Sequence, residues 1–162
     1  MAHILDVMSD RLMLGDGAIG TTVQDMDLDV EKDFHGHENL FNYLVRSRPD
    51  VLRDVHRGFL AAGSELLIGP TFGSTPGVLD EFGLSDQAFD LNKEAIELLC
   101  EVIEEFKGDG RTRFAVGAVG PGTKLPSLDH IDYDRLEDDY DIQCAGIIAG
   151  GADAILIMTC QD

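Results

Sequence analysis

The chain has 162 residues, 44% of them hydrophobic, which is enough for one domain with its own core. Its formal net charge is −19, so it should repel nucleic acids and anionic membranes. No apolar run approaches the about 18 residues of a membrane span, and residues 1–13 lack the basic start of a signal peptide. We therefore expect a single domain over residues 1–162, located in the cytoplasm, with neither a nucleic-acid nor a membrane partner.

Short apolar runs alternate with longer segments of helical periodicity. The runs that predict strands cover residues 11–17, 64–73, 113–120 and 152–158, and the segments that predict helices cover residues 48–63, 85–106 and 132–151. Pro49 suits the first turn of the first helix and Gly63 its C-terminal cap, and Ser85 is a candidate N-cap of the second helix. The order β-α-β-α-β-α-β predicts an α/β fold with parallel strands and right-handed crossovers.

Unusual sequence follows the C-terminal end of each predicted strand: GDGAIGTT, GPTFGST, GPGTKLPS and TCQD. In (β/α)8 barrels and in open α/β sheets, this rim forms the ligand site. We therefore interpret Asp16 as a polar group directed at a ligand, and the Gly/Pro-rich stretch 117–130 as a loop whose backbone approaches that ligand. Two alternatives stay open: Asp16 could serve to bond loop amides, and the stretch could be an ordinary connection.

Two further motifs are less specific. Gly15, Gly17 and Gly20 have the spacing of a dinucleotide-binding fingerprint, but no recognisable helix is predicted after them, so a nucleotide-binding domain is the weakest functional interpretation. His35 and His37 have a spacing that can ligate a metal, but we favour a solvated loop as their explanation.

The three cysteines, Cys100, Cys144 and Cys160, are odd in number and form no CxxC motif. This pattern favours neither a disulfide framework nor a self-contained zinc site. Cys100 and Cys144 lie in helical patterns, where we expect them to be buried small hydrophobic residues, and the role of Cys160 is open.

Taken together, the rim motifs resemble a known family. LGDGAIGTTVQ, SRPDVLRDVHRGFLAAGSELL, TFGST with LDEFGL, VGAVGPGTKLPSL and AGGADAILIMTCQD are similar to the N-terminal part of the homocysteine-binding domain of cobalamin-dependent methionine synthases, whose fold the homocysteine S-methyltransferases share. The resemblance runs from Arg11 to Asp162. It implies the first half of a (β/α)8 barrel, with homocysteine as substrate, and for the full enzyme a zinc ion held by three cysteines and methylcobalamin as methyl donor.

The resemblance also implies which residues bind the substrate and which parts of the full site we do not expect in this chain. The substrate-binding residues that it implies are Asp16, Gly17, Thr71, Val119, Gly120 and Pro121. The family's zinc cysteines match none of the three cysteines here, so we expect this chain to contribute no catalytic residue and no metal ligand, and to bind neither zinc nor methylcobalamin on its own. Methyl transfer would then need a partner, either the remaining barrel half or a second copy, and the isolated chain is expected to be inactive.

Several rim positions depart from the family pattern. Ile68, Gly69 and Pro70 stand where the family usually has Glu-Thr-Asn, Met158 stands where it has Glu, and residues 40–42 stand where it commonly has Cys-Asn-Glu. Compared with the family pattern, polar or acidic pocket residues are thus replaced by apolar residues or by Gly and Pro, which have unusual backbone preferences. The alternative interpretation is a non-catalytic half-barrel scaffold, or a degenerate paralogue, that self-associates. Whether the chain is a fragment, a natural half barrel or an engineered one is left open.

Overall fold

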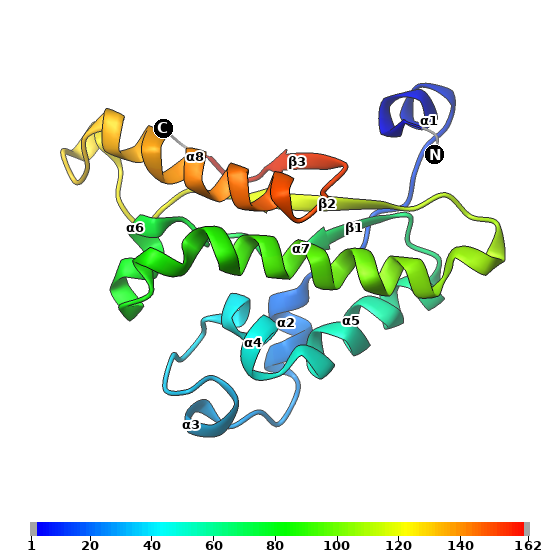
Figure 1. Cartoon of the computed structure of the whole chain (residues 1–162), viewed down its shortest axis with the longest axis horizontal. Helices are drawn as coiled ribbons and strands as arrows, with labels where there is room; N and C mark the ends of the chain where they lie inside the picture. Colours follow the sequence, from blue (N-terminus) through cyan, green and yellow to red (C-terminus); the bar gives the residue numbers. More distant parts are fainter. Residues whose placement is uncertain (1–2, 161–162) are drawn as a thin grey trace.

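The computed structural model describes residues 3–160, and its centre is a sheet of three parallel strands. The strands are β1 (Leu66–Gly69), β2 (Phe114–Val119) and β3 (Ala154–Ile157), and their order in the sheet is β1-β2-β3 (Figure 1). The α/β class and the parallel arrangement are therefore confirmed. A parallel sheet requires crossover connections, and a long helix lies in each of them: Ala88–Glu105 between β1 and β2, and Tyr133–Ala149 between β2 and β3.

Three long helices lie side by side, with α7 in the middle (Figure 1). They are α5 (Pro49–Ala62), α7 (Ala88–Glu105) and α8 (Tyr133–Ala149). The shorter α-helices are α1 (Ile4–Asp10), α2 (Ile19–Gln24), α3 (Val30–Asp33), α4 (Leu44–Ser47) and α6 (Pro76–Leu79). Single 3-10 turns are η1 (Phe41–Tyr43), η2 (Asp80–Phe82), η3 (Ser85–Gln87), η4 (Lys107–Asp109) and η5 (Pro126–Leu128).

The first predicted strand, residues 11–17, is only an isolated bridge between Gly15 and Leu66. The amide of Leu66 donates to Leu14 at 3.1 Å, and the amide of Asp16 donates to Leu66 at 2.9 Å. The next bond of a parallel ladder would join the amide of Ile68 to the carbonyl of Asp16, but that amide donates to the Asp16 side chain instead, at 2.8 Å. The prediction of four strands was therefore wrong by one, because a side chain replaces the main chain in the ladder.

The sequence predicted both ends of α5 correctly but misplaced the start of α7. Helix α5 begins at Pro49, and Gly63 caps it in the left-handed region at φ 107°, as predicted. The expected cap at Ser85 was wrong, because Ser85 lies in the 3-10 turn η3 and α7 begins only at Ala88.

A helix that the sequence did not predict begins within the glycine motif, before Gly20. Helix α2 covers Ile19–Gln24, and Val23 is its one buried residue. A helix of six residues with one buried position gives almost no periodic signal, which explains the wrong prediction. Gly20 lies inside this helix and packs against the ring of Phe41.

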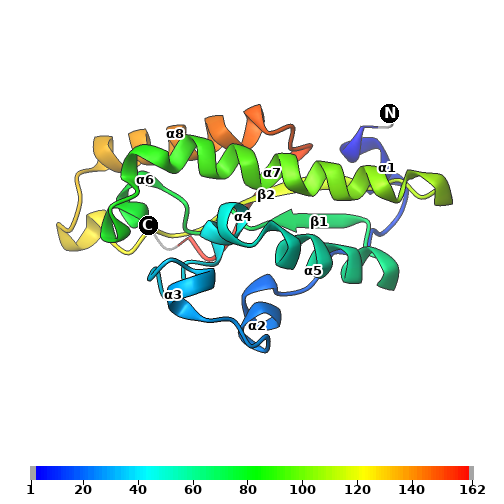
Figure 2. The ribbon, with the colours of Figure 1, turned by 60° about the horizontal axis from the view of Figure 1, so that its bottom comes forward.

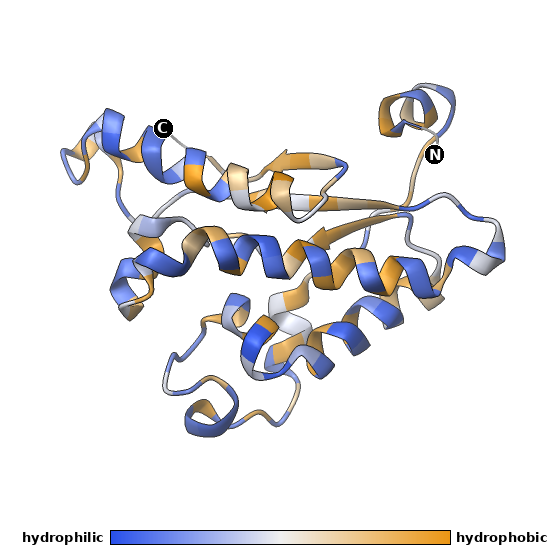
Figure 3. Cartoon of the chain, viewed as in Figure 1, coloured by the Kyte–Doolittle hydropathy of each residue, from blue (hydrophilic) through white to orange (hydrophobic). Residues whose placement is uncertain are grey.

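The core lies between the sheet and these helices. Leu67 in β1 packs in one apolar cluster with Leu91 and Leu99 of α7. Figure 2 shows α7 and α8 on one side of the sheet, and Figure 3 shows apolar strands beside helices of mixed polarity. Glycines allow this close approach: a Cβ at Gly117 would lie 2.3 Å from the side chain of Ile147.

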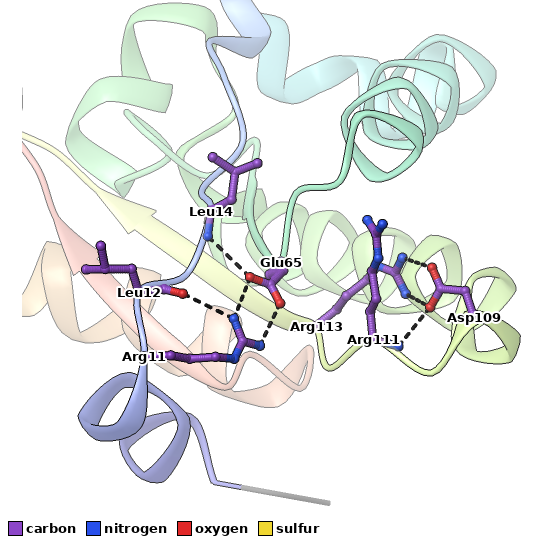
Figure 4. Close-up of polar contacts among 7 residues, drawn as sticks. All are labelled: Arg11, Leu12, Leu14, Glu65, Asp109, Arg111 and Arg113. Atoms are coloured by element: carbon purple, nitrogen blue, oxygen red, sulfur yellow. Dashed lines mark hydrogen bonds and ion pairs between the residues drawn. The ribbon is translucent and has the colours of Figure 1, made fainter.

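Arginine–carboxylate pairs fasten the opposite end of the sheet, where the strands begin (Figure 4). Arg11 makes two hydrogen bonds to Glu65, at 2.8 and 2.6 Å, and so ties the segment after α1 to the start of β1. Arg113 is buried and bonds both Asp109 and the Phe106 carbonyl, so the turn before β2 is held in the same way.

Strand β3 pairs with β2 alone among the strands of residues 3–160. Apolar side chains are exposed along this edge and on the neighbouring helix α8: Ile157 is 71% exposed and Ile148 is 65% exposed. In the same part of the chain, no helix is long and apolar enough to cross a membrane.

Candidate functional site

A cavity of about 270 Å³ lies at the C-terminal ends of the strands. Its lining comes from residues 17–20 of the first rim segment, Phe41 and Asn42 of η1, residues 68–70 and 72 at the end of β1, Ala118 of β2, and Met158 after β3. The cavity therefore lies on the rim that the sequence pointed to. Residues 161–162, the end of the TCQD motif, lie outside the described residues.

The lining is mostly apolar. Ile68, Pro70 and Met158, which depart from the family pattern, all border this one cavity, as does Gly69. The one polar side chain among the lining residues is Asn42, and its Nδ2 donates to the carbonyl of Phe72 at 2.9 Å. The interior thus offers contact area for an apolar group and few hydrogen bonds.

Asp16 supplies a charged group directly behind this lining. Its Oδ2 accepts the amide of Ile68, and its Oδ1 is buried with no hydrogen-bond partner among the described residues. Burial raises the pKa of Asp16 to about 6. The amide that Asp16 accepts belongs to strand β1 rather than to a loop, and the second oxygen is left without a partner in the described part of the chain.

Gly17 and Gly120 have steric reasons to be glycine. A Cβ at Gly17 would lie 2.8 Å from the ring of Phe59, and a Cβ at Gly120 would lie 2.1 Å from the ring of Phe72. Gly17 lines the cavity, and Gly120 supports it through the Phe72 ring. The carbonyl of Gly120 is also fixed, because it accepts the hydroxyl of Tyr140 at 2.8 Å.

The other predicted binding residues lie farther from the lining. The Thr71 hydroxyl is fully buried, donates to the carbonyl of Ala118 at 2.8 Å and accepts its amide at 2.8 Å. Val119 packs in a core cluster with Ile96 and Ile147. Pro121 borders a separate small hollow beside Tyr140. Of the six predicted residues, Gly17 alone lines the cavity; Asp16 and Gly120 contact lining residues, Ile68 and Phe72 respectively, and the other three lie behind or beside it.

Sequence reasoning did not single out four lining residues, Ala18, Ile19, Phe72 and Ala118. Phe72 was the one with a usable signal, because a large aromatic side chain sat inside a rim motif rich in glycine, and it is 44% exposed. Ala18, Ile19 and Ala118 carry no chemical signal of their own.

The candidate metal ligands do not form a site. Among residues 3–160, no group of three His, Cys, Asp or Glu side chains could hold a metal ion. His35 and His37 lie edge-on to the ring of Tyr43. Cys100 and Cys144 are half-buried rather than buried, and Cys160 is exposed, so the three thiols lie in different surroundings. The donor set of the described residues therefore does not fit a zinc site.

Comparisons with known proteins place the chain in a family. The family described as Homocysteine S-methyltransferase matches residues 13–162. The methionine synthase of Mycobacterium tuberculosis is 41% identical over 159 residues, and that of Mycobacterium leprae is 38% identical over the same length. Each match covers 98% of this chain but only 13% of the relative, so the chain spans a small part of these enzymes.

Solved structures agree on the fold. The oxidized form of the homocysteine methyltransferase MmuM from Escherichia coli superposes with a TM-score of 0.72 at 20% identity, over 93% of this chain and 55% of that chain. The metallated form of the same protein gives 0.74 at 18% identity, over 94% and 55%. The chain, with its three-stranded open sheet, thus corresponds to about half of that methyltransferase chain. Because the family match extends over residues 13–162, the chain belongs to the homocysteine S-methyltransferase family.

Proposed function

We propose that this chain is the substrate-binding first half of a (β/α)8 barrel that methylates homocysteine to methionine. The observation that carries the proposal is the carboxyl of Asp16, with one buried, unpartnered oxygen, beside a cavity at the C-terminal ends of parallel strands. In such folds this rim is where ligands bind. The setting is cytoplasmic, as the sequence predicts.

In this proposal Asp16 receives the ammonium group of homocysteine. A charge-assisted hydrogen bond to a buried carboxylate stabilises the bound amino acid by about 1.5–3 kcal/mol. The thiol side chain of homocysteine then lies against the apolar lining made by Ile68, Phe72 and Met158. Gly17 and Gly120 leave room for the rings of Phe59 and Phe72, and the Phe72 ring forms part of the cavity wall.

Residues 3–160 offer no group of side chains that could hold the zinc of the full enzyme. The thiolates that would hold zinc belong, in the proposal, to the remaining barrel half, and so does the contact with methylcobalamin. That half would cover the exposed apolar side chains of the β3 edge, Ile157 among them. No methyl-transfer step is assigned to the described residues.

A second candidate function is a self-associating scaffold without chemistry. The apolar lining contributed by Ile68, Pro70 and Met158 favours it, and so does the open edge of β3. In that case a second copy would cover the edge, and the cavity would have no need of a ligand.

Calorimetric titration of L-homocysteine into the 162-residue chain, after sizing by light scattering, separates the two. We expect binding in the micromolar to millimolar range that weakens about 10-fold or more in Asp16→Asn. Asp25→Asn, the same change at an exposed position after α2, is the matched control and should bind normally. A folded dimer that binds no homocysteine would contradict the proposal and favour the scaffold.

A further inference from the structure

The loop of residues 70–75 connects β1 to α6 and forms one wall of the cavity. Pro70 and Phe72 face the cavity, and the ring of Phe72 occupies the space next to Gly120. Any change in the path of this loop therefore moves the wall and the glycine turn after β2 together.

Three carboxamide side chains from three different elements hold this loop by its backbone. Asn42 of η1 donates to the carbonyl of Phe72 at 2.9 Å. Asn92 of α7 donates to the carbonyl of Ser74 at 2.8 Å, and Gln143 of α8 donates to the carbonyl of Thr71 at 2.6 Å.

These side chains are buried, which makes their presence informative. Asn92 and Gln143 are 0% exposed and Asn42 is 9% exposed. A buried carboxamide is unfavourable unless it is hydrogen-bonded, and an apolar side chain would pack there without that requirement. The Oδ1 of Asn92 and the Oε1 of Gln143 have no partner in the described part of the chain, so the donor end accounts for the contacts seen.

We propose that Asn42, Asn92 and Gln143 act together as positioning residues, which set the path of loop 70–75 and thereby the shape of the ligand cavity. All three bond the loop backbone, and Asn42 also lines the cavity, whereas Asn92 and Gln143 do not. The inference concerns the geometry of the cavity, and it rests on the proposed function only where homocysteine is used as a probe.

The chemistry of the contact gives a sharp variant. A carbonyl oxygen only accepts hydrogen bonds, so a side chain that holds it must donate. Gln143→Glu keeps the shape of the side chain but places a carboxylate oxygen against the carbonyl of Thr71. When the introduced carboxyl is protonated it can donate again, and a buried carboxyl takes up its proton at a higher pH than an exposed one.

Hydrogen exchange of the backbone amides tests the inference without any ligand. The amides of Thr71 and Ser74 are bonded within the loop and its junction with β1, to Gly69 and Thr71 respectively. In Gln143→Glu at pH 8 we expect these amides to exchange about 10-fold faster than in the unmodified chain, with β2 unchanged. As the pH falls to about 5, the difference from the unmodified chain should disappear.

Two controls separate positioning from general stability. Gln87→Glu makes the same chemical change at the last residue of η3, where the side chain accepts from Arg46 rather than holding a loop carbonyl, and it should leave the loop amides unchanged. Ile147→Val, one helical turn after Gln143, weakens the packing of α8 against Gly117 of β2. This variant should raise amide exchange throughout the sheet rather than in the loop. If Gln143→Glu fails to fold, Gln143→Met and the less buried Asn42→Asp remove a donor with less risk.

Unchanged loop exchange in Gln143→Glu, or an equal loss of protection in the loop and in β2, would overturn the inference and leave these residues a purely structural role. In a parallel titration, homocysteine binding should weaken in step with loop exchange. If the unmodified chain binds no homocysteine, the proposed function fails, while the exchange result still decides whether the carboxamides position the loop.

Discussion

The side chain of Asp16 accepts the amide of Ile68 at 2.8 Å, where a parallel ladder would use a backbone carbonyl. This one bond ends the first strand and holds the carboxyl beside the cavity. The second oxygen is buried without a described partner, and burial raises the pKa of Asp16 to about 6. A structural and a ligand-binding role therefore coexist in one residue.

The first prediction concerns the pH dependence of Asp16. Its pKa in the folded chain lies above the value of about 3.9 in an unfolded chain, so the folded state favours the protonated form. Its contribution to stability is therefore present below pH 4 and is lost as the pH rises from about 4 to about 6. Asp16→Asn cannot ionise and should gain stability relative to the unmodified chain across that interval, measured by urea unfolding at pH 4 and pH 7. If the stability difference between Asp16→Asn and the unmodified chain is the same at pH 4 and at pH 7, the raised pKa of Asp16 is contradicted.

The second prediction concerns the ring that rests on Gly120. Gly120→Ala places a methyl group in the space of the Phe72 ring, which can swing outward because it is 44% exposed. We expect a loss of stability below about 2 kcal/mol but a clear weakening of homocysteine binding, since a cavity wall has moved. Gly122→Ala is the control, because a Cβ there meets no atom closer than 3.8 Å. Equal binding by both variants would place Phe72 outside the ligand site.

The third prediction compares two glycines in opposite settings. A Cβ at Gly117 would lie 2.3 Å from Ile147, so Gly117→Ala must push α8 away from β2 and should cost about 1–3 kcal/mol. Gly58 lies exposed inside α5 with nothing within 4 Å, so Gly58→Ala should stabilise the chain by about 0.5–1 kcal/mol. Thermal unfolding of the two variants checks both signs. A neutral Gly117→Ala would mean that the helix lies farther from the sheet.

The sequence predicted those features that depend on regular periodicity or on one strong local signal. Helix α5 has both, with apolar residues at helical spacing between Pro49 and Gly63, and its bounds were right. The predicted first strand does not form beyond one bridge, because the Asp16 side chain replaces a ladder bond, and no hydrophobic pattern can reveal such a replacement. Helix α2 was not predicted, because it is too short to show a helical period.

The candidate site was predictable only in its place on the rim. Loop motifs after the strands located it, and Asp16 was identified by its charge at a strand end. The buried hydroxyl of Thr71 and the carboxamide of Gln143 act through contacts with residues 47 and 72 positions away in the sequence. Such long-range contacts follow from the packing of α8 and β2 on the loop, and a single sequence carries no local signal for them.

The last prediction concerns His56, which lies on α5 and is 0% exposed, with both ring nitrogens unpartnered among the described residues. Burial lowers the pKa of His56 from about 6.5 to about 4. As the pH falls below 6.5, the unfolded chain binds a proton that the folded chain excludes, so stability declines between pH 6.5 and pH 4, by about 3 kcal/mol in total. His56→Leu should remove this acid sensitivity without loss at pH 7, because no hydrogen bond is given up. Urea unfolding at pH 7 and pH 4.5 measures the difference, and His130→Leu, at an exposed position, should behave as the unmodified chain does. An unchanged acid slope in His56→Leu would show that this ring has the same pKa in the folded and the unfolded chain, and would contradict the prediction.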